Sequence, residues 1–229
     1  MMTARDEILA KVKQALGRRD GGTDVAQAIS LPGEVASSPL PQDALVEQFA
    51  AALRRVGGRF SVAADAPAVG DQIAEIAAQV RARKAVGWHS PWLEQLGLTR
   101  RLAEIGVAFV TDRERADKAA FINEAADAAL GITAVDYALA DSGTLCLLAA
   151  RHQPRTASLL PPLHVAVLRR AQLIGGLDEL FARLPVGSEM SSAVTLITGP
   201  SRTADIELTL VVGVHGPQEV HVILADWAC

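Results

Sequence analysis

The residues best suited to chemistry lie in the sequence GPSRT, residues 199–203, directly after an apolar run. The run predicts a strand over 193–198, and the residues after the loop predict a helix over 203–210. A loop that leads from a strand into a helix presents free backbone N–H groups and the positive end of the helix dipole. Such a junction binds anions, so this segment predicts a site for a small carboxylate or phosphate.

The side chains of this loop suit that chemistry. Gly199 would let a ligand approach the backbone closely, because it has no side chain. Ser201 and Thr203 offer hydroxyl groups, and Arg202 offers a planar set of donors that matches a carboxylate or a phosphate. In the alternative, Ser201 or Thr203 only caps the helix, and Arg202 is solvated.

Two carboxylates follow in the first turns of the expected helix. Asp205 and Glu207 would repel an anionic ligand, and residues two apart on a helix point to different sides. We therefore expect no chelating pair there. Asp205 is the better candidate for a general base, because it lies closer to the loop.

Two histidines have contexts that suit a binding or catalytic site. His215 is followed by Gly216 in the sequence GVHGP, a turn in which an imidazole and a glycine backbone would reach a ligand. Imidazole titrates near neutral pH and suits acid–base chemistry, although a loop histidine is also common as polar surface. His164 enters an apolar run, where it is either a ligand-binding residue or a hydrogen-bonded core histidine.

A third polar segment interrupts apolar sequence at ALADSGTL, residues 138–145. Its simplest interpretation is a hairpin turn. In a pocket at a sheet edge, however, Ser142, Thr144 and the Gly143 backbone would hold an anionic group, with Asp141 as acid, base or orienting residue.

Several classes of site are excluded by the sequence. No GxGxxG, Walker, GxSxG, CxxC or HExxH motif is present, and no metal site is expected. The two cysteines, Cys146 and Cys229, are too few to ligate an iron–sulfur cluster alone, and they point to a reducing compartment. We expect no cofactor in this chain.

Composition limits location and partners. A net charge of −4 does not favour nucleic acid, and no window approaches the roughly 18 consecutive apolar residues of a membrane span. The charged N-terminal segment lacks the apolar core of a signal peptide. We therefore expect a cytoplasmic protein with no membrane span.

The elements that position these residues follow from periodicity. An amphipathic helix is predicted over 1–16 and a linker rich in Gly, Pro and Ser over 17–41, before an α/β domain over 42–229. In its first part, predicted helices alternate with predicted strands, which is typical of parallel βαβ units. After Asp136, apolar runs follow one another without helix-length segments, which predicts antiparallel or mixed strands. The expected fold is a three-layer α/β domain with a largely parallel sheet and a mixed C-terminal half.

The sequence TGPSRTADIELTLVVGVHGPQEVHVILAD, with ALADSGTL and PPLHVAVL upstream, resembles the lactate utilization protein C family, whose domain is the LUD domain. The resemblance implies a fold similar to the sugar-phosphate isomerase and coenzyme A transferase-like group. It also implies a role in oxidising L-lactate to pyruvate with two companion proteins that carry iron–sulfur clusters.

Three hypotheses fit these residues. In the first, the chain is a non-redox subunit that binds the carboxylate of lactate or pyruvate through Ser201 and Arg202, with His215 and Asp141 in the same pocket. In the second, it is a stand-alone isomerase or transferase for a phosphorylated or thioester metabolite, with Asp141, Asp205 or His215 as base. In the third, it is a regulatory module that senses a carboxylate and signals through its N-terminal helix.

Overall fold

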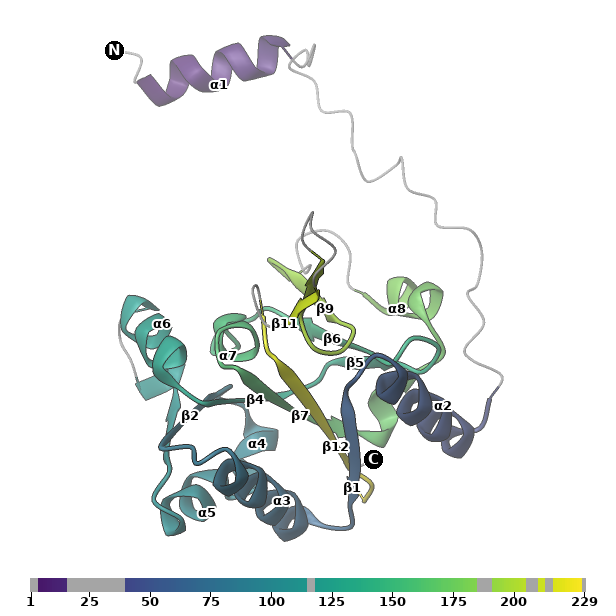
Figure 1. Ribbon diagram of the computed structural model, residues 1–229. Helices are drawn as coiled ribbons and strands as arrows, with labels where there is room; N and C mark the ends of the chain where they lie inside the picture. The colour runs from purple at the N-terminus through teal and green to yellow at the C-terminus, as the bar shows by residue number, and fades with distance from the viewer. Residues whose placement is uncertain are drawn as a thin grey trace. The chain divides into compact units, whose positions relative to one another are not determined.

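Figure 1 shows the computed structural model of the chain, which describes residues 4–15, 40–114, 118–184, 191–204, 210–212 and 216–227. The chain divides into two compact units, Met1–Glu34 and Val35–Cys229. In the first unit, α1 (Ala4–Ala15) occupies the segment for which an N-terminal helix is predicted. All but the last two residues of the predicted linker lie outside the described residues.

The second unit is built on six strands that are all parallel. Their order is β1 (Arg59–Ala63), β12 (Glu219–Ala225), β7 (Leu163–Arg169), β4 (Leu130–Ala134), β2 (Lys84–Gly87) and β3 (Ala108–Thr111). The neighbouring strands β7 and β12 are almost continuous apolar runs, and all but one residue of each is buried. Such runs are typical of parallel strands covered on both faces.

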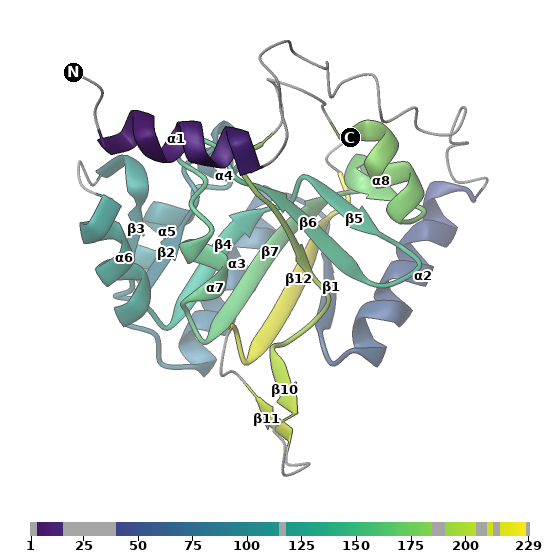
Figure 2. The same ribbon diagram turned by 90° about the horizontal axis from the view of Figure 1, so that it is seen from above.

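Helices cover both faces of this sheet (Figures 1 and 2). They are α3 (Ala66–Gln79) on β1 and β12, α5 (Leu98–Glu104) on β3, α6 (Lys118–Asp127) on β2, and α7 (Thr156–Leu159) on β4. The chain crosses the sheet in one direction through α3 and α5 and returns through α6 and α7. Because crossovers between parallel strands are right-handed, the two directions place these helix pairs on opposite faces.

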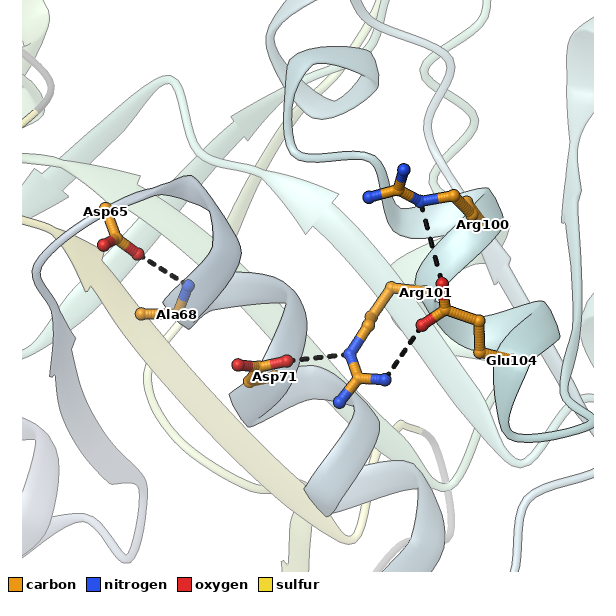
Figure 3. Close-up of polar contacts among 6 residues, drawn as sticks. All are labelled: Asp65, Ala68, Asp71, Arg100, Arg101 and Glu104. Atoms are coloured by element: carbon orange, nitrogen blue, oxygen red, sulfur yellow. Dashed lines mark hydrogen bonds and ion pairs between the residues drawn. The ribbon is translucent and has the colours of Figure 1, made fainter.

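A cap and three ion pairs, the third between Arg100 and Glu104, lie on α3 and α5 (Figure 3). Asp65 Oδ1 accepts a hydrogen bond from Ala68 N at 2.8 Å, which caps α3. Arg101 of α5 contacts Asp71 of α3 at 2.7 Å and Glu104 of its own helix at 3.0 Å. These groups are largely exposed, so the pairs orient the two helices more than they stabilise them.

A second, four-stranded sheet comes from the later half of the chain. Its order is β8 (Leu173–Ile174), β5 (Tyr137–Leu139), β6 (Thr144–Leu148) and β9 (Val194–Ile197), with β5 parallel to β8 and the other two pairs antiparallel. Alternate residues face opposite ways, as in any strand. Ala138, Leu145 and Ile197 join the main core, whereas Leu139 and Cys146 pack in a second cluster with α8 (Leu177–Arg183).

The helix α2 (Gln42–Arg55) connects the two sheets. It packs against β1 of the first sheet and β8 of the second. Its apolar face, with Leu45, Phe49 and Leu53, is buried in the main core. This helix therefore packs against both the parallel sheet and the mixed sheet.

The expected α/β class with a largely parallel sheet is confirmed. Mixed strands also occur after Asp136, but they form a sheet of their own. The later half of the chain also supplies β7 and β12, which lie between the strands of the first half in the parallel sheet. Within the described ranges, no helix is long and apolar enough to cross a membrane.

Candidate functional site

Two of the predicted polar segments come together where β6 and β9 pair. Thr198 directly follows β9 and lies beside Thr144 at the start of β6, with 2.8 Å between their Oγ1 atoms. Thr144 Oγ1 donates in turn to Ser142 Oγ at 2.9 Å. Because a hydroxyl has one hydrogen to donate, Thr198 is the donor to Thr144. The three hydroxyls thus form a directed chain that ends at Ser142, whose own hydrogen is left for another acceptor.

Two glycines hold these turns against the C-terminal end of α2. Gly143 has a φ of +68°, and a Cβ there would lie 2.4 Å from Leu53 N. Gly199 has a φ of +81°, and a Cβ there would lie 2.8 Å from Val56 O. Positive φ and the close backbone both require glycine. The end of α2 therefore sets where the two turns meet.

Arg202 lies at the same end of α2. Its side chain is exposed, and a Cβ on Gly57 would be 2.4 Å from Arg202 Nη2. A guanidinium beside the C-terminus of a helix is favoured by the helix dipole, and it remains able to bind an anion from solvent.

Ser201 and Gly216 are also brought together. A Cβ on Gly216 would lie 3.3 Å from Ser201 Cβ and 3.6 Å from its Oγ. The backbone N–H groups are less available than expected, because Ser201 N donates to Pro217 O at 2.8 Å and Gly143 N donates to Leu139 O at 3.0 Å. Anion recognition here would depend on hydroxyls and on a guanidinium.

The helix predicted over 203–210 is wrong at both of its ends. β10 (Arg202–Ala204) and β11 (Leu210–Val212) are strands that pair antiparallel, and they extend away from the sheets in Figure 2. The sequence ADIELTLVV alternates polar and apolar residues, a period of two that is typical of a strand. The loop GPSR thus leads into a strand, and the predicted site at a helix N-terminus is corrected to a site between turns.

Asp141 is placed near a different element. Its N donates to Gly175 O at 3.1 Å, and a Cβ on Gly176 would lie 2.5 Å from its Oδ2. Gly176 precedes α8, so the carboxylate lies near the N-terminus of that helix. Asp141 therefore contacts the segment that leads into α8. Its role in a site stays a prediction.

His164 is a core residue with one hydrogen bond. It is fully buried in β7, and its Nε2 lies 2.9 Å from Thr133 Oγ1 on β4. Among the described residues, Nδ1 has no partner. Burial lowers the pKa of His164 to about 4, so the imidazole is neutral at neutral pH.

Three of the predicted site residues lie wholly or partly outside the described part of the chain. Asp205 and His215 lie outside the described residues, and of Thr203 only the backbone is described. In the part of the chain that the structure describes, no group of three or more His, Cys, Asp or Glu side chains is arranged to hold a metal ion. Thr198 opens the segment that the sequence singles out, but sequence reasoning gave it no role, and it missed Thr133.

The fold and these turns define the class: an α/β protein in which a mixed sheet packs on a parallel sheet and carries a small polar site. The LUD domain matches residues 46–225, and the chain belongs to that family. The chain is 36% identical over 152 residues to lactate utilization protein C of Halalkalibacterium halodurans. That match covers 63% of this chain and 64% of the relative, slightly under two thirds of its length.

A longer match is to lactate utilization protein C of a Geobacillus species, strain WCH70. It is 31% identical over 232 residues and covers 97% of this chain and 96% of the relative. Among solved structures, a DUF162 family protein from Deinococcus radiodurans aligns with a TM-score of 0.54 at 20% identity, covering 82% of this chain and 100% of that one. At this identity the likeness shows the fold.

Replacing Thr144 with Val tests the chain of hydroxyls. Thr144→Val keeps the shape of the side chain but removes both the acceptor for Thr198 and the donor to Ser142. We expect the free energy of unfolding in urea to fall by about 1–2 kcal/mol. The control Thr195→Val, on β9, should change it by less than about 0.5 kcal/mol. Equal effects of the two substitutions would contradict the assignment.

Burial of His164 makes stability depend on pH. Its pKa rises from about 4 in the folded chain toward the ordinary 6.5 on unfolding. The unfolded state therefore binds more protons below pH 6.5, and stability is lost as pH falls from 6.5 toward 4. Between pH 7 and 5, urea titrations should show that the wild type loses about 2 kcal/mol more than His164→Gln. Parallel pH profiles for the two proteins would reject a neutral buried imidazole.

Proposed function

We propose that this chain binds a small carboxylate, lactate or pyruvate, as a non-redox subunit of a cytoplasmic system that oxidises L-lactate to pyruvate. The observation that carries the proposal is the match over nearly the whole chain to a relative named lactate utilization protein C. Membership of the LUD domain family supports it.

The chemistry of the side chains at these turns supports an anion site. Ser142 ends a chain of hydroxyls with a hydrogen to donate, and Ser201 lies beside Gly216. Arg202 brings an exposed guanidinium near the same end of α2. A carboxylate accepts hydrogen bonds from hydroxyls and pairs with a guanidinium through two parallel bonds.

Oxidation of lactate needs an electron acceptor. We propose that two companion proteins with iron–sulfur clusters accept the electrons. Such a cluster takes four thiolate ligands in most proteins, and this chain has two cysteines. Burial, together with the nearby Asp136 carboxylate, raises the pKa of Cys146 to about 11. That thiol stays protonated at neutral pH, which disfavours metal ligation.

The experiment removes the chain from a bacterium that encodes it and restores variants. Deletion should abolish growth on L-lactate, and the wild-type chain should restore it. Arg202→Ala should bind L-lactate or pyruvate roughly 10- to 100-fold more weakly, the effect of losing a charge-assisted hydrogen bond, and should restore growth poorly. Binding is measured by calorimetry on the full chain.

Arg83→Ala is the control, because Arg83 is an exposed arginine that precedes β2 and lies outside the turns. It should bind and complement as the wild type does. The tagged wild-type chain should also co-purify with proteins that contain iron and acid-labile sulfide. Lactate oxidation at the wild-type rate in the deletion strain would contradict the proposal, as would equal affinities of Arg202→Ala and Arg83→Ala.

A further inference from the structure

A second group of ionisable side chains lies at the carboxyl edge of the parallel sheet, away from the turns of the proposed carboxylate site. His89 follows β2, and Asp112 and Arg113 follow β3. His152, from the segment before α7, contacts this group: His89 N donates to His152 O at 3.1 Å, and the two rings meet edge to face at 5.8 Å. Three distant segments of the chain therefore converge at one place.

The location is where the topology of an α/β sheet favours a ligand. The connection after β2 runs through α4 (Pro91–Gln95) and α5, and the connection after neighbouring β3 runs through α6. These helices cover opposite faces, so the loops after β2 and β3 separate at the carboxyl edge. A crevice forms where neighbouring loops diverge in this way.

Hydrogen bonds assign the proton of His89. Its Nδ1 lies 3.0 Å from Glu94 Oε1, and its Nε2 lies 3.2 Å from Arg113 Nη1. A guanidinium only donates, so Nε2 is the acceptor and the proton is on Nδ1, where it is donated to Glu94. Glu94 thus orients the His89 imidazole, and Nε2 of that ring accepts a hydrogen bond from Arg113.

His152 and Asp112 lie next to each other in the same group. His152 Nδ1 lies 3.3 Å from Asp112 Oδ2. The backbone of His152 has a φ of +65°, an uncommon conformation for a residue with a side chain. Such strain persists only where the surrounding contacts hold it, as the hydrogen bond from His89 N to His152 O does here.

A cavity of about 350 Å³ opens beside His89. One part of its lining is apolar, with Trp88, Leu93 and Phe109. The polar part includes two guanidiniums, Arg100 and Arg113, whose side chains are 88% and 65% exposed. Two carboxylates lie near these guanidiniums: Glu94 contacts His89 and lies 3.7 Å from Arg113, and Glu104 lies 3.8 Å from Arg100. Both guanidinium pairs are long and exposed and so contribute little, which leaves Arg100 and Arg113 able to exchange them for an anionic ligand.

We propose that this crevice binds an organic anion larger than lactate, with its anionic head on Arg113 and Arg100 and its apolar body against Trp88, Leu93 and Phe109. The head competes with His89 for Arg113. When Arg113 turns to the ligand, His89 Nε2 faces the cavity as a hydrogen-bond and proton acceptor, oriented by Glu94. Arg113 is exposed and reaches a carboxylate or a phosphate head equally, and the experiment below separates these.

The test titrates the full chain with benzoate, phenyl phosphate, acetate and inorganic phosphate while the imidazole resonances are followed by NMR. The His89 resonance is assigned by its loss in His89→Gln. We expect benzoate or phenyl phosphate to shift it saturably, and acetate and inorganic phosphate to bind at least about tenfold more weakly because they lack an apolar body. The stronger of the two aromatic probes identifies the head group.

Three variants decide the assignment. Arg113→Ala should weaken binding of the better aromatic probe roughly 10- to 100-fold, whereas Arg155→Ala, an exposed arginine outside the cavity lining, should leave it unchanged. Arg202→Ala should also leave it unchanged, which separates this site from the proposed lactate site. The absence of a saturable shift with either aromatic probe would overturn the proposal, as would equal affinity of Arg113→Ala and the wild type.

Discussion

The contact of two glycines with the end of α2 is the constraint on which the proposed carboxylate site depends. Gly143 and Gly199 come from turns some fifty residues apart, and each lies within van der Waals reach of α2 backbone because neither has a side chain. Since α2 packs against both sheets, this contact also fixes the mixed sheet on the parallel sheet. The hydroxyls of Ser142, Thr144 and Thr198 align as a consequence.

The amino and carboxyl edges of the parallel sheet have different polar side chains. Around the turns at the end of α2, hydroxyls and a single guanidinium are suited to hold a small carboxylate. At the carboxyl edge, an oriented imidazole lies beside a partly apolar cavity of about 350 Å³, which is more than a three-carbon acid would fill. His164 lies between strands in the core and is neutral at neutral pH, so it contributes a hydrogen bond to the packing and no charge.

Much of the fold could be predicted because hydrophobic periodicity is local: helices were expected to alternate with strands in the first part of the domain, and α2, β1, α3 and β2 follow one another in that order. The helix expected over 203–210 failed, because a loop with Gly and Pro before acidic residues resembles a helix start even where the period is two. His89, Arg113 and His152 were not recognised as a group, because strand order brings them together and one sequence does not reveal that order. The sequence predicted that Asp141 of the 138–145 segment shares a pocket with Ser201 and Arg202, but not the Thr144–Thr198 contact through which the two segments meet.

The central claim is that lactate or pyruvate binds at the turns on α2. Its most direct test is a map of backbone amide shifts in the full chain during titration with L-lactate and with pyruvate. The account predicts saturable shifts at Ser142, Gly143 and Ser201, with the amides of Trp88 and His89 unmoved. Shifts confined to Trp88 and His89, or no saturable shift at any of the five, would contradict it.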